Sequence, residues 1–251
     1  MVKPYPSYFG GKSAAGVPQT LINLIPPIKK LIVGFAGNCS VLANMKLPES
    51  IIICDLDKKV LKDWEKIFSR DPNIIVDDTS GNLSLFNEVH VRIINENFIT
   101  LLQHHQKNRL DLNQDTLLYL DPPYPLSTRT SGHRYKYELT DQQHGDLLST
   151  IKVIPAKVMI CSYENEMYNT MLADWNRLYY ISQTRRGKRK EVVFFNYPIP
   201  ERLHDYSYIG SNFRERERIK KKVSREIARM NRMKTIERNA IIDAIERNFK
   251  R

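Results

Sequence analysis

The sequence predicts an α/β fold: a mainly parallel β-sheet with helices on both faces, followed by a small helical appendage. Three observations lead to this prediction. Short apolar runs alternate with segments of helical pattern over residues 12–198. Glycine-containing or acidic motifs follow several of these runs, which is typical of the carboxyl ends of parallel strands. After Pro198 and Pro200 the composition becomes strongly basic, and apolar residues recur at helical spacing.

The elements of the sheet are expected in alternating order along the first 200 residues. The strands are predicted near 31–35, 50–54, 73–76, 91–94, 116–120, 157–161, 178–182 and 191–196. The helices are predicted near 12–24, 39–46, 57–69, 98–107, 140–152 and 164–174. Because ligands of a parallel sheet lie at the carboxyl ends of its strands, the motifs at those ends are expected to share one crevice.

A glycine-containing turn and an acid follow the first two predicted strands. The strand near 31–35 leads into Phe35-Ala36-Gly37-Asn38, and the strand near 50–54 ends at Asp55, 18 residues after Gly37. In nucleoside-binding α/β units, an acid about 20 residues beyond the glycines binds the ribose hydroxyls. Only Gly34 and Gly37 are present here, so the complete G-x-G-x-x-G pattern is missing. The order of the motifs favours a nucleoside-binding unit.

The motif Asp121-Pro122-Pro123-Tyr124 follows the apolar run Leu117–Leu120. Its carboxylate can accept a hydrogen bond from an amine, and a main-chain carbonyl of the stiff Pro-Pro unit can accept another. The Tyr124 ring offers a stacking surface for a flat base. The motif therefore predicts a pocket for an amine on an aromatic ring, although Asp-Pro-Pro also occurs as an ordinary turn at the end of a strand.

Two further segments complete a family pattern: Tyr8-Phe9-Gly10-Gly11-Lys12 and Arg129–Thr140, which reads RTSGHRYKYELT. From Tyr8 to about Pro198 the chain resembles the Dam-like (D12 class) DNA adenine-N6 methyltransferases. The resemblance implies a Rossmann-like sheet that uses S-adenosylmethionine. The cofactor-binding residues it implies are Tyr8, Lys12, Phe35, Ala36, Gly37, Asn38, Asp55, Asn97 and Asp121. The catalytic residues it implies are Asp121, Pro122, Pro123 and Tyr124.

This chain departs from the family pattern at two places. Asn38-Cys39 stands where the glycine loop usually carries a second glycine, and Asn97 stands where the family often has an acid for the cofactor adenine. Asparagine can donate to or accept from an adenine edge, so cofactor binding is still expected.

The activity that the resemblance implies is site-specific methylation of the N6 amine of a flipped DNA adenine. Three alternatives stay open at this point. An RNA adenine-N6 methyltransferase would meet the same flipped base. A protein glutamine methyltransferase is less favoured, because similar pockets there usually begin with Asn. The chain could also be a catalytically silent nucleic-acid-binding protein of the same fold, although the intact Asp121 and Tyr124 argue against this.

Composition fits a globular protein with a polyanionic partner. The chain has 251 residues, a net charge of +11 and a pI near 9.5, with 41% hydrophobic and 27% charged residues. The expected partner is double-stranded DNA, with a companion restriction endonuclease as a further option. No signal peptide or membrane-spanning run is expected, so the predicted location is cytoplasmic, on DNA. The three cysteines and six histidines show no disulfide or metal spacing.

Two domains are predicted: a catalytic domain over 1–200 and a basic helical extension over 201–251. Only about 20 residues separate Phe98 from Leu117, too few for an inserted recognition domain. Recognition is therefore expected in two short loops, 126–140 and 183–190, where basic residues stand among tyrosines, serines and threonines. Solvated loops are the alternative interpretation. The DNA-binding candidates are Arg129, Arg134, Tyr135, Lys136, Arg185, Arg186, Lys188, Arg189 and Lys190.

The extension carries 15 of the Lys/Arg residues and 8 of the Asp/Glu residues. Two apolar stripes at helical spacing run through it: Ile219, Val223, Ile227 and Met230, then Ile241, Ile242, Ile245 and Phe249. They predict a helical hairpin that packs on the core or on a partner. Its basic face could follow DNA or simply be solvated.

Overall fold

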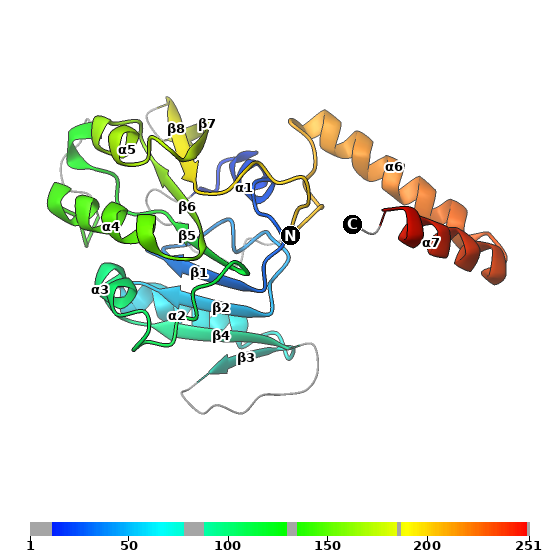
Figure 1. Cartoon of the computed structure of the whole chain (residues 1–251), viewed down its shortest axis with the longest axis horizontal. Helices are drawn as coiled ribbons and strands as arrows, with labels where there is room; N and C mark the ends of the chain where they lie inside the picture. Colours follow the sequence, from blue (N-terminus) through cyan, green and yellow to red (C-terminus); the bar gives the residue numbers. More distant parts are fainter. Residues whose placement is uncertain (1–11, 78–87, 130–134, 185–186, 250–251) are drawn as a thin grey trace. The chain divides into compact units, whose positions relative to one another are not determined.

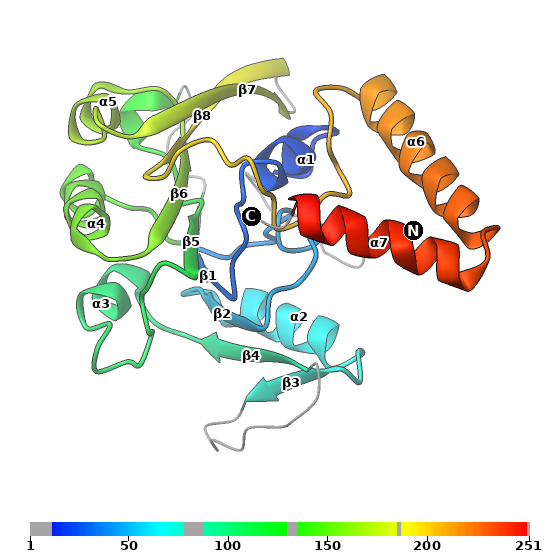
Figure 2. The same ribbon diagram turned by 45° about the vertical axis from the view of Figure 1, so that its right-hand side comes forward.

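A computed structural model of the protein describes residues 12–77, 88–129, 135–184 and 187–249. The chain forms two compact units, Met1–Asp205 and Tyr206–Arg251, which are described separately. Unit 1 contains the sheet and its covering helices, and unit 2 contains two helices (Figures 1 and 2).

Unit 1 is built on one eight-stranded sheet in the order β3-β4-β2-β1-β5-β6-β8-β7. Every neighbouring pair is parallel except β6–β8 and β7–β8, which are antiparallel. The chain starts in the middle at β1, builds outward through β2 to one edge, and returns to β5 on the other side. This reversal is the topological switch point of a Rossmann-like sheet, and it confirms the predicted fold class. The strands are Lys30–Gly34 (β1), Ser50–Cys54 (β2), Ile74–Asp77 (β3), Val89–Ile94 (β4), Thr116–Leu120 (β5), Lys157–Ser162 (β6), Asn176–Thr184 (β7) and Gly187–Phe195 (β8).

The central strands are apolar along their whole length because helices cover both faces of the sheet. All five residues of β5 are buried, as are four of the five in β1 and in β2. Parallel strands buried on both faces read as continuous apolar runs rather than alternating ones. The apolar runs seen in the sequence therefore mark the centre of the sheet.

Five α-helices of unit 1 are described, and they divide between the two faces of the sheet. Figures 1 and 2 show α3, α4 and α5 on one face and α1 and α2 on the other. The helices are Val17–Ile22 (α1), Lys58–Phe68 (α2), Phe98–Gln103 (α3), Asp141–Val153 (α4) and Glu166–Met171 (α5).

Side-chain caps fix where the helices near the strand ends begin. The Asp57 carboxylate accepts from Lys59 N at the start of α2, and Asn97 accepts from Ile99 N at the start of α3. A capping box joins Thr140 and Gln143 at the start of α4. Each cap sets the direction in which the chain leaves a strand end, and so shapes the crevice there.

The helix predicted near 39–46 is wrong. Successive turns occupy this stretch: Ala43 N and Met45 N donate four residues back, whereas Asn44 N donates three back, to Val41. The Asn44 amide also donates to the Ser40 carbonyl at 2.7 Å. A side chain that competes for main-chain acceptors interrupts a regular helical ladder.

Unit 2 consists of α6 (Phe213–Asn231) and α7 (Thr235–Phe249), which confirms the two predicted helices. Asn212 caps α6 by accepting from Glu215 N at 3.0 Å. Contacts with the described residues do not bury the first apolar stripe, since Val223 is 52% exposed and Ile227 is 55% exposed. Burial of that stripe against a partner therefore stays a prediction.

Candidate active site

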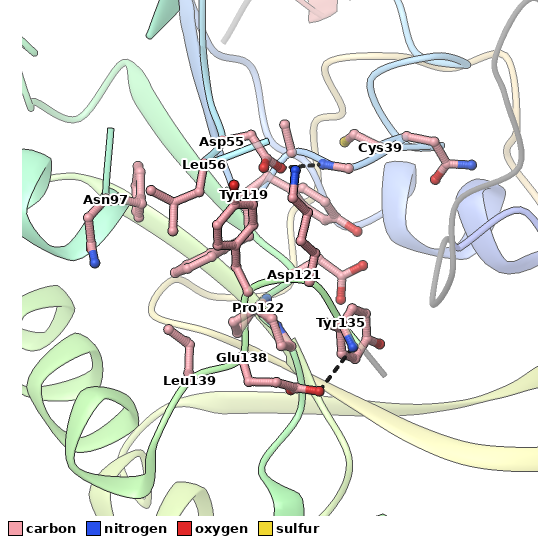
Figure 3. A pocket seen from close by; sticks show the side chains of 18 of the residues that line it. Cys39, Asp55, Leu56, Asn97, Tyr119, Asp121, Pro122, Tyr135, Glu138 and Leu139 are labelled. Carbon is pink, nitrogen blue, oxygen red and sulfur yellow. Dashed lines mark hydrogen bonds between the residues drawn. The ribbon is translucent and has the colours of Figure 1, made fainter. Parts of the chain in front are cut away.

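The carboxyl ends of β1, β2, β4 and β5 surround one cavity of about 360 Å³. It extends from the glycine loop Phe35–Ser40 to the Asp121-Pro122-Pro123 turn. Figure 3 shows Asp55, Leu56 and Asn97 on one part of its wall and Asp121, Pro122 and Tyr135 on another. The sheet thus brings most of the sequence-predicted cofactor and catalytic residues to one place.

The glycine loop turns sharply after β1 and fixes the neighbouring acid. Phe35 has φ 56° and Gly37 has φ 45°, both in the left-handed region. This turn aims Gly37 N at the Asp55 Oδ2 atom, 2.9 Å away, and Asp57 N donates to Oδ1 at 2.7 Å. The Trp64 Nε1 atom donates to the Gly37 carbonyl at 2.8 Å and holds the loop from α2.

Gly34 allows a close contact beneath this loop. A Cβ atom at Gly34 would lie 2.7 Å from the ring of Phe98, so a larger residue would displace that ring. Phe98 also packs edge-on against Phe35, with ring centroids 5.5 Å apart. The floor of the cavity below the glycine loop is therefore aromatic.

Asp55 is suited to bind a diol. Burial raises the pKa of its carboxyl, while the main-chain N–H groups of Gly37 and Asp57 oppose the rise. Each carboxylate oxygen accepts one main-chain N–H and keeps acceptor capacity for a hydroxyl group. This pattern fits the ribose of a nucleoside cofactor.

Asn97 lines the same cavity and can make a different contact from the acid it replaces. Its Oδ1 atom accepts from Ile99 N at 2.9 Å and from Thr100 N at 3.4 Å as the cap of α3. The amide nitrogen is thereby oriented away from those main-chain donors, and it can donate to a ring nitrogen of an adenine. The cavity therefore presents an acceptor for a ribose, a donor for a base and an aromatic floor, which fits S-adenosylmethionine.

A buried charge cluster adjoins the cavity at the end of β5. The Lys12 Nζ atom donates to Asp121 Oδ1 at 2.7 Å and to Oδ2 at 2.9 Å, and it lies 4.7 Å from the centre of the Tyr124 ring. The same Nζ atom is 3.4 Å from Glu191 Oε2, which accepts from the Tyr124 hydroxyl at 2.6 Å. The sequence predicted Lys12 as a cofactor residue, and in the structure its ammonium contacts Asp121, the predicted catalytic carboxylate.

The cluster keeps its lysine charged. Burial by itself would lower the pKa of Lys12, but Asp121 and Glu191 raise it well above its ordinary value. Burial raises the pKa of Asp121, and the Lys12 ammonium opposes that rise. Tyr163 packs against the Tyr124 ring in a T-shaped arrangement, with centroids 4.6 Å apart, so this ring is held by Tyr163 as well as through its hydroxyl.

The segment after Tyr124 is braced by an internal ion pair. Arg129 donates to both carboxylate oxygens of Glu138, at 3.1 and 2.6 Å, and its side chain is 7% exposed. Glu138 also accepts from Tyr135 N at 3.0 Å, as the dashed line in Figure 3 shows. Arg129 therefore holds Tyr135 against the cavity, an arrangement that favours a bracing role for this arginine.

The other described DNA-binding candidates lie at the cavity edge or on β8. Lys136 is 61% exposed and lies 3.4 Å from Asp57. Lys188, Arg189 and Lys190 lie within β8, which pairs antiparallel with β7. This strand begins at Gly187, whose φ is 114°. Lys190 lies over the Tyr179 ring at 3.9 Å. Four predicted site residues lie outside the described residues: Tyr8, Arg134, Arg185 and Arg186.

Three contributors to the site were missed from the sequence: Glu138, Tyr163 and Glu191. Glu191 did carry a signal, since it is a lone acid at the start of the apolar run Val192–Phe195 and directly follows a basic segment. Glu138 had no comparable signal, because an acid in a polar loop is ordinarily solvated. Tyr163 carried none beyond its place at the end of a strand.

Within the described residues, no group of His, Cys, Asp and Glu is arranged to hold a metal ion. No helix in the same part of the chain has both the length and the apolar character needed to cross a bilayer. The described cysteines Cys39, Cys54 and Cys161 are buried free thiols.

The sheet order, the glycine loop and the two strand-end carboxylates define a Rossmann-like methyltransferase with S-adenosylmethionine as its cofactor. Residues 79–186 match the model of the family described as D12 class N6 adenine-specific DNA methyltransferase. This match confirms, over these residues, the resemblance drawn from the sequence.

Several solved methyltransferase structures are similar to this chain. A SAM-dependent methyltransferase from Methanosarcina mazei is 10% identical, with 70% of this chain and 95% of that one covered at a TM-score of 0.43. An N-methyltransferase from Bradyrhizobium japonicum is 10% identical, with 71% of this chain and 92% of that one covered at a TM-score of 0.44. An rRNA methylase from Streptococcus thermophilus is 10% identical, with 71% of this chain and 92% of that one covered at a TM-score of 0.37. Comparison with curated proteins finds no match.

Removal of the Asp55 carboxylate is expected to weaken cofactor binding. Asp55→Ala should reduce S-adenosylmethionine affinity by about 1.5–3 kcal/mol, the scale of hydrogen bonds to a charged group. Calorimetric titration measures this directly. Asp57→Ala is the matched control. It removes the side-chain cap of α2, and Asp57 does not line the cavity. Equal affinities for wild type and a folded Asp55→Ala protein would remove Asp55 from the site.

Proposed function

We propose that this protein is a site-specific DNA adenine-N6 methyltransferase that acts on an adenine flipped out of the duplex. The observation that carries the proposal is the position of the Lys12 ammonium. This amine donates to both oxygens of Asp121 and lies over the Tyr124 ring. A base amine bound by Asp121 and stacked on Tyr124 would use the same acceptor and the same aromatic surface.

The family match supports the choice of adenine in DNA. It covers residues 79–186, a range that includes Asp121–Tyr124 and the braced segment containing Arg129 and Glu138. The net charge of +11 fits a polyanionic substrate.

The chemistry assigned to Asp121 is polarisation of the target amine. The lone pair of an adenine N6 atom is delocalised into the ring, which makes it a poor nucleophile. If Asp121 and a main-chain carbonyl of Pro122 or Pro123 accept its two hydrogens, the nitrogen moves toward tetrahedral geometry and its lone pair becomes available. When bound, S-adenosylmethionine supplies an electrophilic methyl group on its sulfonium.

The protein contributes positioning and electrostatics to this reaction, with no covalent bond to the enzyme. Transfer would form one N–C bond and break one S–C bond, with the sulfur leaving as a neutral thioether, and the extra N6 proton would then pass to water. Asp121 acts as a hydrogen-bond acceptor throughout, so its ionised form is the active one. Asp55, Asn97 and the loop Phe35–Asn38 are the residues proposed to hold the cofactor.

Recognition of DNA is assigned to the two loops 126–140 and 183–190 of the catalytic domain 1–200. The extension 201–251 is proposed to add affinity rather than sequence preference. In loop 126–140, Arg129 is proposed to brace the loop around Glu138, and the exposed Lys136 to meet DNA. In loop 183–190, the exposed residues Lys188–Lys190 of β8 are proposed to contact phosphates.

The test is a methylation assay with nucleoside analysis. Wild-type protein is incubated with S-adenosylmethionine and either duplex DNA or RNA of mixed sequence, and the digested nucleosides are identified by mass spectrometry. The expected product is N6-methyldeoxyadenosine, produced from DNA and absent with Asp121→Ala. Methylated cytosine in DNA, or methylated adenine in RNA alone, would contradict the proposal. Sequencing of methylated positions then gives the recognised site.

Neutralising a phosphate contact on β8 is expected to weaken DNA binding without changing sequence preference. Lys188→Ala should lower affinity for all duplexes alike and reduce the slope of log K against log salt by about 0.9. Fluorescence anisotropy at several salt concentrations measures both quantities. Lys62→Ala on the exposed face of α2 is the matched control and should leave the slope unchanged. An unchanged slope for Lys188→Ala would exclude that contact.

A further inference from the structure

Glu191 is a buried carboxylate that the assigned chemistry does not use. It lies at 5% exposure on β8, directly opposite Tyr180 of β7. Its Oε2 atom accepts from the Tyr124 hydroxyl at 2.6 Å and from the Tyr180 hydroxyl at 3.0 Å. Its Oε1 atom accepts from the Ser182 hydroxyl. Three hydroxyl donors therefore hold this carboxylate in one orientation.

Glu191 also shares the buried ammonium of Lys12. The Nζ atom lies 2.7 Å from Asp121 Oδ1 and 3.4 Å from Glu191 Oε2, so one cation stands between two carboxylates. Burial favours the protonated form of Glu191, but Lys12 and the three hydroxyl donors prevail and lower its pKa. The group stays ionised within the cluster.

This arrangement bears on how Asp121 becomes available. In the structure both Asp121 oxygens accept from Lys12, and that ammonium lies over the Tyr124 ring. A target amine needs the same oxygens and the same ring. Lys12 must therefore withdraw when a base enters, and a buried ammonium needs a counter-charge wherever it goes. Among the described residues, Glu191 is the carboxylate already within reach.

We propose that Glu191 is a positioning residue for methyl transfer: it fixes the Tyr124 ring through its hydroxyl and accepts the Lys12 ammonium when Asp121 binds the target amine. The inference rests on the proposed function of Asp121 and Tyr124. It gives β8 a second role beside its basic residues.

The contact of Glu191 with Lys12 and its contact with Tyr124 affect the pH dependence of the methylation rate differently. The negative charge of Glu191 raises the pKa of Asp121, whereas Lys12 lowers it. Asp121 must be ionised to accept the amine, so activity is present above its pKa and is lost as pH falls through it. Glu191→Gln removes a charge that raises this pKa and leaves Lys12 to Asp121 alone. Both changes lower the pKa of Asp121. The fall of the methylation rate at low pH, the acid limb of the pH–rate profile, therefore moves to lower pH.

Other groups near Asp121 do not interfere with this signature. Several described titratable groups interact electrostatically with Asp121. They are Lys12, Cys39, Tyr119, Tyr124, Tyr135, Cys161, Tyr168, Tyr180 and Glu191. Burial raises the pKa of every thiol and phenol in this set, so they stay neutral near pH 7. Among the described residues of this set, only Lys12 and Glu191 carry charge there.

The experiment compares Glu191→Gln with Glu191→Asp, using single-turnover methylation across pH. Glu191→Gln is expected to lower the plateau rate about tenfold or more and to shift the acid limb to lower pH. Glu191→Asp keeps the charge but withdraws it from Tyr124, so the rate should fall while the acid limb stays in place. Glu164→Gln, an exposed acid beside the same hairpin, is the matched control and should behave as wild type.

Two further measurements need no methylation substrate. Cofactor affinity by calorimetry should be unchanged in all three variants, because Glu191 does not line the cavity. The ¹⁵N resonance of the Lys12 ammonium should move in Glu191→Gln and stay in Glu164→Gln. If Glu191→Gln fails to fold, Glu191→Asp still tests the contact with Tyr124.

An unmoved acid limb and an unmoved Lys12 resonance in a folded Glu191→Gln protein would overturn the proposal, as would a wild-type rate in Glu191→Asp. These outcomes differ from failure of the proposed function. That failure appears in the wild-type protein itself, as a methylated product other than N6-methyladenine in DNA. The Glu191 comparison would then be made with whichever substrate the wild type methylates.

Discussion

Asp121→Ala is expected to lower the rate of methyl transfer by about 10³-fold while leaving cofactor affinity close to wild type. The carboxylate is the only side-chain acceptor that this mechanism assigns to the target amine, and loss of one preorganised electrostatic contact costs on the order of 10²–10³-fold. Asp55 and Asn97, which are assigned to the cofactor, lie on another part of the cavity wall. Single-turnover assays and calorimetry measure the two effects separately.

The same substitution also leaves a buried cation with one carboxylate fewer. Lys12 is 4% exposed, and without Asp121 the nearest acid among the described residues is Glu191 at 3.4 Å. Removal of one partner of a buried ion pair destabilises by about 3–5 kcal/mol, so the melting temperature should fall. Asp121→Asn is the matched control, because it keeps the shape and an acceptor oxygen but removes the charge. A folded Asp121→Ala protein that methylates at near wild-type rate would refute the mechanism.

The strands could be predicted because burial on both faces leaves a simple mark on the sequence. Leu117–Leu120 and Ile51–Ile53 are apolar without interruption, and both became central strands. The motifs Asp55 and Asp121–Tyr124 stand directly after such runs, so their position at one edge of the sheet followed from topology. The short stretch 39–46 was assigned wrongly, because its apolar spacing does not reveal competition from Asn44.

The electrostatic core of the site was beyond sequence reasoning. Lys12 and Asp121 are 109 residues apart, and Tyr124 and Glu191 are 67 apart, so no local pattern joins them. The ion pair between Arg129 and Glu138 could not be predicted from the sequence for a different reason. A basic loop with tyrosines fits DNA contact and internal ion pairing equally well, and only the fold determines which acid comes within reach.

Tyr124→Ala is expected to have the second largest effect, lowering the methylation rate by about 10²-fold. Stacking of a base on an aromatic side chain is worth about 1–3 kcal/mol, and the extruded base loses that surface. Tyr124 is 5% exposed, so its removal also opens a cavity and should reduce stability by about 3–5 kcal/mol. Rates are measured in single-turnover assays below the melting temperature of the variant.

Tyr124→Phe separates the ring from the hydroxyl. The ring stays available for stacking, but Glu191 loses the donor at 2.6 Å and keeps those of Tyr180 and Ser182. Because a hydrogen bond to a charged group contributes about 1.5–3 kcal/mol, the rate should fall by roughly tenfold, between wild type and Tyr124→Ala. Tyr163→Phe keeps the edge-on packing and should remain near wild type. If Tyr124→Phe were as inactive as Tyr124→Ala, the hydroxyl and its bond to Glu191 would outweigh stacking in holding the flipped base.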